Sequence, residues 1–136
     1  MKLIIYSDGG ARNNPGPAGF GYVIQDAHGK TIAARGEYIG EATNNVAEYR
    51  GIISAAKRAL ELGATDAEFR VDSELLARQV SGQYRVKAPT LRPLIIELMA
   101  ILRKIPSWSV AHVRREFNPE ADALVNRAID ERGVVE

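Results

Sequence analysis

Cysteine is absent from this sequence of 136 residues. Without a thiol the chain has no disulfide framework, no thiolate nucleophile and no zinc-thiolate site. Histidine is scarce as well, because only His28 and His112 are present. Any metal ion bound by this chain must therefore be held by oxygen ligands or by these two histidines.

Long apolar runs are also missing. No stretch approaches the roughly 20 apolar residues of a membrane span, and the apolar run over residues 3–6 is far too short for a signal peptide. We therefore expect a cytosolic protein. The chain is too short for a large two-lobed machine, and its length and 46% apolar content predict one compact domain over residues 1–136.

Neither sign of charge dominates the sequence. Eighteen Lys and Arg residues against 17 Asp and Glu residues give a net charge of +1, which neither requires nor excludes a polyanionic partner. The distribution is uneven, because basic residues outnumber acidic ones about threefold between residues 70 and 115. This stretch hints at one basic face.

The spacing of apolar residues predicts strands first and then an alternation of helices and strands. The run over residues 2–8 is typical of a buried strand, and residues 19–25 and 31–38 resemble the two strands of a hairpin. Helical spacing begins at Asn44 and stops at Gly63.

The second half of the chain predicts strands over residues 68–71 and 107–113, and helices over 73–82, 91–105 and 119–132. Thr90 and Asn118 are the expected caps of the last two helices. The order βββαβααβα predicts an α/β fold with a five-stranded mixed sheet and helices on both faces. Sites in such sheets form at the carboxyl ends of adjacent strands.

Four acidic residues stand at the ends of these predicted elements, and each has a purely structural explanation. Asp8 precedes two glycines and can form a turn. Glu48 lies three residues after Asn45, which is the spacing of a capping box. Asp72 can cap the helix that follows it, and the helix dipole favours Asp122 in the first turn of the last helix.

The positions of these four acids also predict that they meet. Asp8 and Asp72 end strands that should be neighbours, and helices that begin near Glu48 and Asp122 can pack beside those ends. Four carboxylates gathered there would repel one another unless a cation compensates, and hard divalent ions, chiefly Mg²⁺, prefer oxygen ligands. Two such ions about 4 Å apart would clamp the attacking water and the leaving oxygen at phosphorus. The pattern therefore predicts a two-metal phosphoryl hydrolase.

Four motifs resemble those of the type 1 ribonuclease H family, in its order and spacing and across essentially the whole chain: "YSDGGARNNPGPAGFGYV", "TNNVAEYRGI", "RVDSELL" and "NPEADALVNRA". The resemblance implies the ribonuclease H-like fold. It also implies hydrolysis of the RNA strand of an RNA–DNA hybrid, leaving 5′-phosphate and 3′-hydroxyl ends.

The resemblance implies a role for each of the four acids as a catalytic, metal-binding residue. Asp8 and Asp72 would anchor two Mg²⁺ ions, for which Mn²⁺ can substitute. Glu48 would bind one ion near the RNA 2′-hydroxyl, and Asp122 would complete the ligands of the ion on the water side.

Substrate contacts are also implied by the resemblance. An enzyme that cuts RNA only beside DNA must detect 2′-hydroxyls on one strand and their absence on the other. The polar loops have a structural alternative, because Asn and Thr favour turns and helix caps. The implied contacts are the backbone around Gly9, Gly10 and Arg12, the side chains of Asn14, Asn44 and Asn45 in the minor groove, and Thr43 on a DNA phosphate.

Two features depart from the family pattern. Many members carry a histidine in the loop before the last acid, whereas "VRREFNPEAD" has none, so the proton-shuttling step is unassigned. Arg114 and Arg115 in this loop are candidate contacts to a phosphate, or simply solvated side chains. Larger relatives also insert a basic, tryptophan-containing helix, for which residues 82–90 are too few. Phosphate contacts would then come from Arg85, Lys87 and Arg92.

Several alternatives stay open at this stage. Some compact relatives also act on double-stranded RNA. A nuclease for branched or single-stranded DNA can use the same fold. A non-catalytic nucleic-acid-binding module would result if all four acids were caps and turns. No membrane and no obligate protein partner is implied.

Overall fold

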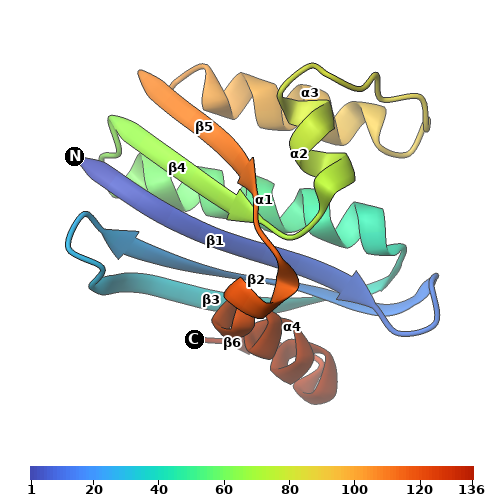
Figure 1. Cartoon of the computed structure of the whole chain (residues 1–136). Helices are drawn as coiled ribbons and strands as arrows, with labels where there is room; N and C mark the ends of the chain where they lie inside the picture. Colours follow the sequence, from blue (N-terminus) through green and yellow to red (C-terminus); the bar gives the residue numbers. More distant parts are fainter.

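A six-stranded mixed sheet forms the centre of the structure, and the computed structural model describes residues 1–136 (Figure 1). The strands lie in the order β5-β4-β1-β2-β3-β6, so the first strand of the sequence is central. The strands are β1 (Lys2–Ala11), β2 (Gly16–Asp26), β3 (Thr31–Ala42), β4 (Asp66–Val71), β5 (Ser107–His112) and β6 (Val134–Val135).

The pairing pattern confirms the predicted mixed sheet. β1 pairs with β2 antiparallel and with β4 parallel, and β5 continues the parallel side. Leu3 and Ile5 of β1 lie in the core beneath α1 and are fully buried, whereas Ile4 and Tyr6 on the opposite face are half-buried. The sequence predicted five strands, and the sixth is the short β6, which pairs with β3 and is too brief to show an apolar pattern.

Helices cover both faces of the sheet, as expected. The helices α1 (Asn44–Glu61), α2 (Glu74–Val80) and α3 (Arg92–Leu102) lie on one face, and α4 (Pro119–Glu131) lies on the other (Figure 1). The larger apolar core fills the space beneath the first three helices and includes Phe69, Tyr49 and Leu98. A smaller cluster lies under α4. No helix combines the length and the apolar character needed to cross a membrane.

The helix starts differ from the predicted ones in ways that matter for the four acids. Thr43 caps α1 by accepting a hydrogen bond from the backbone N–H of Val46 at 3.2 Å, so Glu48 is not the closing residue of a capping box. Ser73, not Asp72, caps α2 by accepting from the backbone N–H of Leu76 at 3.1 Å. Both carboxylates are therefore free of the capping roles that the sequence allowed.

One predicted cap is wrong, and another is right only in its position. Leu91, not Thr90, occupies the cap position of α3, and no side chain caps that helix. Asn118 does stand at the cap position of α4, but its side chain makes no cap hydrogen bond. In both helices a proline in the first turn removes one of the backbone donors that have no partner at a helix start.

Candidate functional site

The register of β1 and β4 brings the first two acids together. Ser7 pairs with Val71, which is the last residue of β4. Asp8 and Asp72 each follow this pair, so they lie side by side where the parallel pairing stops. β1 itself continues to Ala11 along β2, so Asp8 lies inside its strand rather than at the predicted end.

Glu48 reaches the same place because α1 lies unusually close to β1. A Cβ atom on Gly9 would stand 2.3 Å from the carbonyl carbon of Ala47, a distance that no real side chain tolerates. Only glycine permits this approach. The carboxylate of Glu48, one residue beyond Ala47, is thereby delivered to Asp8.

Three carboxylates meet at this point. One oxygen from each of Asp8, Glu48 and Asp72 lies within 4.8 Å of the other two. Asp8 is 8% exposed, and the side chain of Asp72 is 5% exposed. The side chains enclose a small hollow that Ser73 also lines. These three residues define the acidic cluster, and they are three of the four acids that the sequence predicted to meet.

Burial and mutual repulsion make this cluster unfavourable when it is fully ionised. Burial, followed by the negative charge of Asp72, raises the pKa of Asp8 to about 8. Burial raises the pKa of Glu48 to about 7, although a hydrogen bond from Ser73 and the charge of Arg115 work in the opposite direction. Burial also raises the pKa of Asp72. Near neutral pH the cluster therefore holds protons unless a cation replaces them.

The donor set fits a hard divalent cation. All of its ligands are carboxylate oxygens, which Mg²⁺ and Mn²⁺ prefer. The Oδ2 atom of Asp72 is buried and has no hydrogen-bond partner, and the Nε atom of Arg115 lies 4.0 Å away. A buried, unpartnered anionic oxygen is costly unless it binds something. The cluster is therefore consistent with a metal site.

Asp122 lies beside the acidic cluster but outside its tightest part. It occupies the first turn of α4, and its negative charge contributes to the raised pKa of Asp8. α4 can lie this close because Gly21, the β2 partner of Asp8, has no side chain. A Cβ there would stand 2.7 Å from the carbonyl oxygen of Ala121. The structure thus groups three predicted acids directly and places the fourth at their edge.

Asn118 is a site residue whose role the sequence did not reveal. It is 1% exposed, and its side-chain N–H donates to the backbone carbonyl of Ser7 at 3.0 Å. This bond joins the start of α4 to the strand position next to Asp8. The available signal was its place four residues before Asp122, but the same position is typical of an ordinary helix cap.

The predicted substrate-binding loops are held together by their own side chains. The Oδ1 atom of Asn44 accepts from the backbone N–H of Ala11 at 2.7 Å, and the Oδ1 atom of Asn14 accepts from the backbone N–H of Asn44 at 3.0 Å. These bonds fix the β1–β2 loop to the start of α1 and leave the amide N–H groups as donors. Arg12 forms an ion pair with Asp130 at 2.6 Å.

The predicted basic contacts lie in exposed segments. Arg85 and Lys87 stand in the connection between α2 and α3, and both are exposed. Arg114 and Arg115 lie between β5 and α4, with side chains 80% and 84% exposed. Of these four, only Arg115 approaches the acidic cluster. His112 is the exposed last residue of β5 and is not part of that loop.

Comparison with protein families gives one match that spans most of the chain. A sequence model of the family described as "Reverse transcriptase-like" matches residues 6–128. Among individual proteins, the bifunctional protein Rv2228c of Mycobacterium tuberculosis is 44% identical over 131 residues, which are 96% of this chain and 36% of the relative. Ribonuclease HI of Halobacterium salinarum is 41% identical over 96% of this chain and 65% of its own length. The chain thus spans about a third and about two thirds of these relatives.

Solved structures show the same likeness in three dimensions. The N-terminal RNase H domain of the M. tuberculosis protein gives a TM-score of 0.94 at 42% identity, covering 96% of this chain and 95% of the other. The RNase H1 of H. salinarum gives a TM-score of 0.93 at 40% identity, covering 96% of this chain and 99% of the other. LC11-RNase H1, solved in complex with an RNA/DNA hybrid, gives a TM-score of 0.92 at 46% identity, covering 96% of this chain and 98% of the other.

Proposed function

The chain belongs to the ribonuclease HI family, and we propose that it is a metal-dependent endoribonuclease that cuts the RNA strand of RNA–DNA hybrids. The observation that carries this proposal is the meeting of Asp8, Glu48 and Asp72, with a buried oxygen of Asp72 left unpartnered. The relative LC11-RNase H1 supports the substrate class, because it was solved with such a hybrid.

The acidic residues of this chain would bind the metal ions. Asp8, Glu48 and Asp72 would hold Mg²⁺, with Asp122 adding a ligand from the edge of the cluster. Two bound ions supply an activated water and neutralise charge on the leaving oxygen, so the protein needs no nucleophile of its own. The products would carry 5′-phosphate and 3′-hydroxyl ends.

Exposed arginine and lysine side chains would bind the negatively charged phosphates of the substrate. Arg115 stands 4.0 Å from Asp72, close enough to contact a phosphate held at the acidic cluster. Arg85, Lys87 and Arg114 would bind phosphates farther along the duplex, which makes binding salt-dependent. With no histidine between β5 and α4, we assign no proton carrier there.

The loops between β1 and β2 and before α1 would select the hybrid. The amide N–H groups of Asn14, Asn44 and Asn45 would donate to oxygens in a shallow minor groove, which the backbone around Gly9, Gly10 and Arg12 would also contact. Thr43 would contact a DNA phosphate. Hydrogen bonds to a 2′-hydroxyl distinguish RNA from DNA on one strand. The hydrogen bonds from Asn44 to the Asn14 side chain and from Ala11 to the Asn44 side chain would hold these donors in position before the substrate binds.

A non-catalytic binding module is disfavoured by the helix starts. That alternative required Glu48 and Asp72 to be helix caps, whereas Thr43 and Ser73 cap those helices.

End-labelled RNA–DNA, RNA–RNA and DNA–DNA duplexes of one sequence, incubated with Mg²⁺ or Mn²⁺, test the proposal. We expect cleavage of the RNA strand of the hybrid, to 5′-phosphate products. Intact RNA in the hybrid, with folded protein, would refute the activity. Cleavage of the DNA duplex would instead favour a DNA nuclease, and equal cleavage of the RNA duplex would broaden the substrate.

A further inference from the structure

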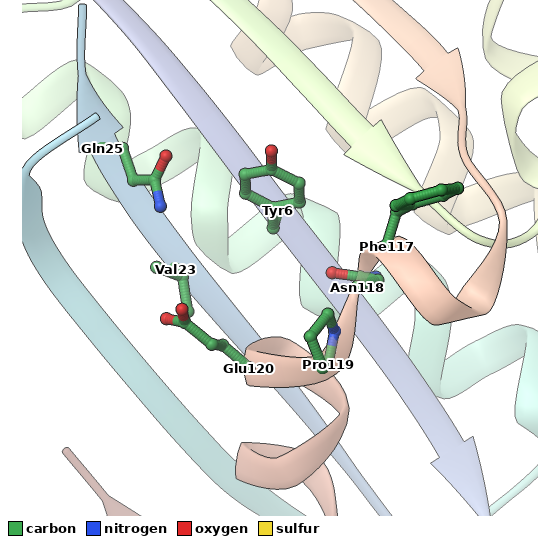
Figure 2. Close-up of a pocket in the computed structure, with 7 residues that line it drawn as sticks. All are labelled: Tyr6, Val23, Gln25, Phe117, Asn118, Pro119 and Glu120. Atoms are coloured by element: carbon green, nitrogen blue, oxygen red, sulfur yellow. The ribbon is translucent and has the colours of Figure 1, made fainter. Parts of the chain in front are cut away.

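A second hollow lies at the start of α4, away from the acidic cluster (Figure 2). Its cavity volume is about 150 Å³, which is below the usual range for ligand pockets. None of Asp8, Glu48 and Asp72 lines it. The lining residues are Tyr6, Val23, Gln25, Phe117, Asn118, Pro119 and Glu120.

The side-chain amide of Asn118 forms part of this wall and offers an unused acceptor. A backbone carbonyl can only accept, so the bond to Ser7 identifies the amide nitrogen and places Oδ1 on the opposite side of the group. Figure 2 shows this oxygen on the side that faces Val23 and Glu120. The Oδ1 atom is buried and has no hydrogen-bond partner. Such an acceptor can accept a hydrogen bond from a donor placed in the hollow.

The rest of the hollow combines a second acceptor with aromatic surface. The carboxylate of Glu120 and the amide of Gln25 lie on one side of it in the view of Figure 2. The rings of Tyr6 and Phe117 line the other side, and Phe117 is 63% exposed although it is large and apolar. A half-buried ring and an exposed ring beside paired acceptors suit a flat, ring-shaped ligand that carries N–H donors on one edge.

A neighbouring hollow supplies positive charge. It shares Tyr6 and Phe117 with the first and adds Arg70 and Arg114. Arg70 is already engaged, because its Nη1 atom donates to the Tyr6 hydroxyl at 2.6 Å and its Nε atom donates to Glu68 at 2.7 Å. Arg114 is 80% exposed and has only a distant partner at 3.5 Å. Arg114 is therefore available to an anion.

We propose that these two adjoining hollows form a site for a guanine nucleotide. The base would lie against Tyr6 and Phe117, and its two adjacent N–H groups would donate to Glu120 and to Oδ1 of Asn118. The phosphate would contact Arg114. A cationic side chain of a partner protein would match the acceptors but would be repelled by Arg70 and Arg114. A nucleotide fits both hollows, because its base meets the acceptors and its phosphate meets the positive charge. This site is separate from the cleavage site proposed above.

Calorimetric titration of the metal-free protein with GMP, AMP, guanosine and inorganic phosphate tests the site. EDTA keeps the nucleotides from binding through a metal ion at the acidic cluster. We expect one GMP per chain and a dissociation constant at least about tenfold weaker for AMP, because adenine has no second donor on that edge. Glu120→Gln should weaken GMP binding about tenfold. Arg114→Gln should weaken GMP binding but leave guanosine binding unchanged.

Two controls locate the site. Glu131→Gln, at the far end of α4, and Asp8→Asn, in the acidic cluster, should bind GMP as the unmodified chain does. The proposal is overturned by the absence of heat with GMP at millimolar concentration. It is also overturned by equal binding of GMP and AMP, by a Glu120→Gln variant that binds normally, or by loss of GMP binding in Asp8→Asn. None of these outcomes bears on whether the protein cuts hybrids.

Discussion

The side-chain N–H of Asn118 donates to the backbone carbonyl of Ser7 at 3.0 Å, across 111 positions of sequence. Ser7 immediately precedes Asp8, and Asn118 immediately precedes the helix that carries Asp122. The bond therefore joins the two backbone segments that bring these carboxylates to one place. Asn118 is buried, so its removal leaves the Ser7 carbonyl without this donor.

Asn118→Ala should lower the maximal cleavage rate by about tenfold to a hundredfold, since small displacements of reacting groups are costly. The unpaired Ser7 carbonyl should also cost about 1–3 kcal/mol of folding free energy. The Michaelis constant should change less than the rate, because Asn118 does not contact the duplex. Asn126→Ala, which removes an exposed hydrogen bond to the Asp122 carbonyl on the same helix, is the matched control. Equal effects of the two variants would contradict the account.

The metal-free protein should lose stability as the pH rises from about 5 to about 8. Burial raises the pKa of Asp8 to about 8 and that of Glu48 to about 7, from ordinary values of 3.8 and 4.5. In this window the folded chain holds protons that the unfolded chain has released, so higher pH favours unfolding. Thermal melting in EDTA across this range measures the effect.

The same melting series with Mn²⁺ separates the acidic cluster from other titrating groups. The ion should raise the melting temperature more at high pH than at low pH, because fewer protons must then be displaced. Asp8→Asn should flatten the pH slope and stabilise the metal-free protein at pH 8 by an amount on the order of 2 kcal/mol. An unchanged slope in that variant would show that Asp8 is not the responsible group.

Gly9→Ala should separate β1 from α1. The added Cβ would stand 2.3 Å from the Ala47 carbonyl carbon, so backbone must move, at a cost of about 1–3 kcal/mol. Glu48 would move with the helix, and cleavage should fall even at temperatures where the variant is folded. Gly10→Ala is the stability control, because its Cβ would meet only the Oδ1 atom of Asn44 at an ordinary 3.7 Å. Urea unfolding of both variants measures the difference, and equal stabilities would refute the close-approach argument.

Asn14→Ala should weaken recognition of the hybrid without disturbing the acidic cluster. The substitution frees the backbone N–H of Asn44 and removes one donor, so the Michaelis constant for the hybrid should rise about tenfold while metal-dependent stabilisation stays the same. His28→Ala, in the turn between β2 and β3 at the other end of the sheet, should leave the Michaelis constant and the metal-dependent stabilisation unchanged. A rise in the Michaelis constant for both variants would mean that the loop has no specific role.

The order of elements was predictable because apolar spacing determines which segments can be buried. The central position of β1 follows from its unbroken apolar run, and its parallel pairing with β4 follows from the helix between them. The proximity of Asp8 and Asp72 could be predicted for the same reason. The two-residue β6 could not be predicted, because a segment that short has no detectable period.

Side-chain roles at helix starts were less predictable. The sequence offers several candidate caps, of which Thr43 and Ser73 cap α1 and α2. The side chains of Asn45, Asp72, Thr90 and Asn118, which the sequence also offers, cap no helix. Cap preference is a local rule that Ser and Thr satisfy as well as Asp and Asn. Which neighbour is used depends on tertiary contacts, such as the bond from Asn118 to Ser7. The second hollow depends on such contacts too, so nothing in the sequence indicated it.

Cleavage of an end-labelled RNA strand in an RNA–DNA hybrid, by the unmodified chain and by Asp8→Asn with Mg²⁺, tests the central claim most directly. The matched control is Asp66→Asn, which makes the same substitution at the opposite end of the parallel pairing. The account predicts cleavage by the unmodified chain and by Asp66→Asn. It predicts hybrid binding without cleavage by Asp8→Asn. Cleavage by Asp8→Asn at the unmodified rate, or no RNA cleavage by the folded, unmodified chain, would contradict it.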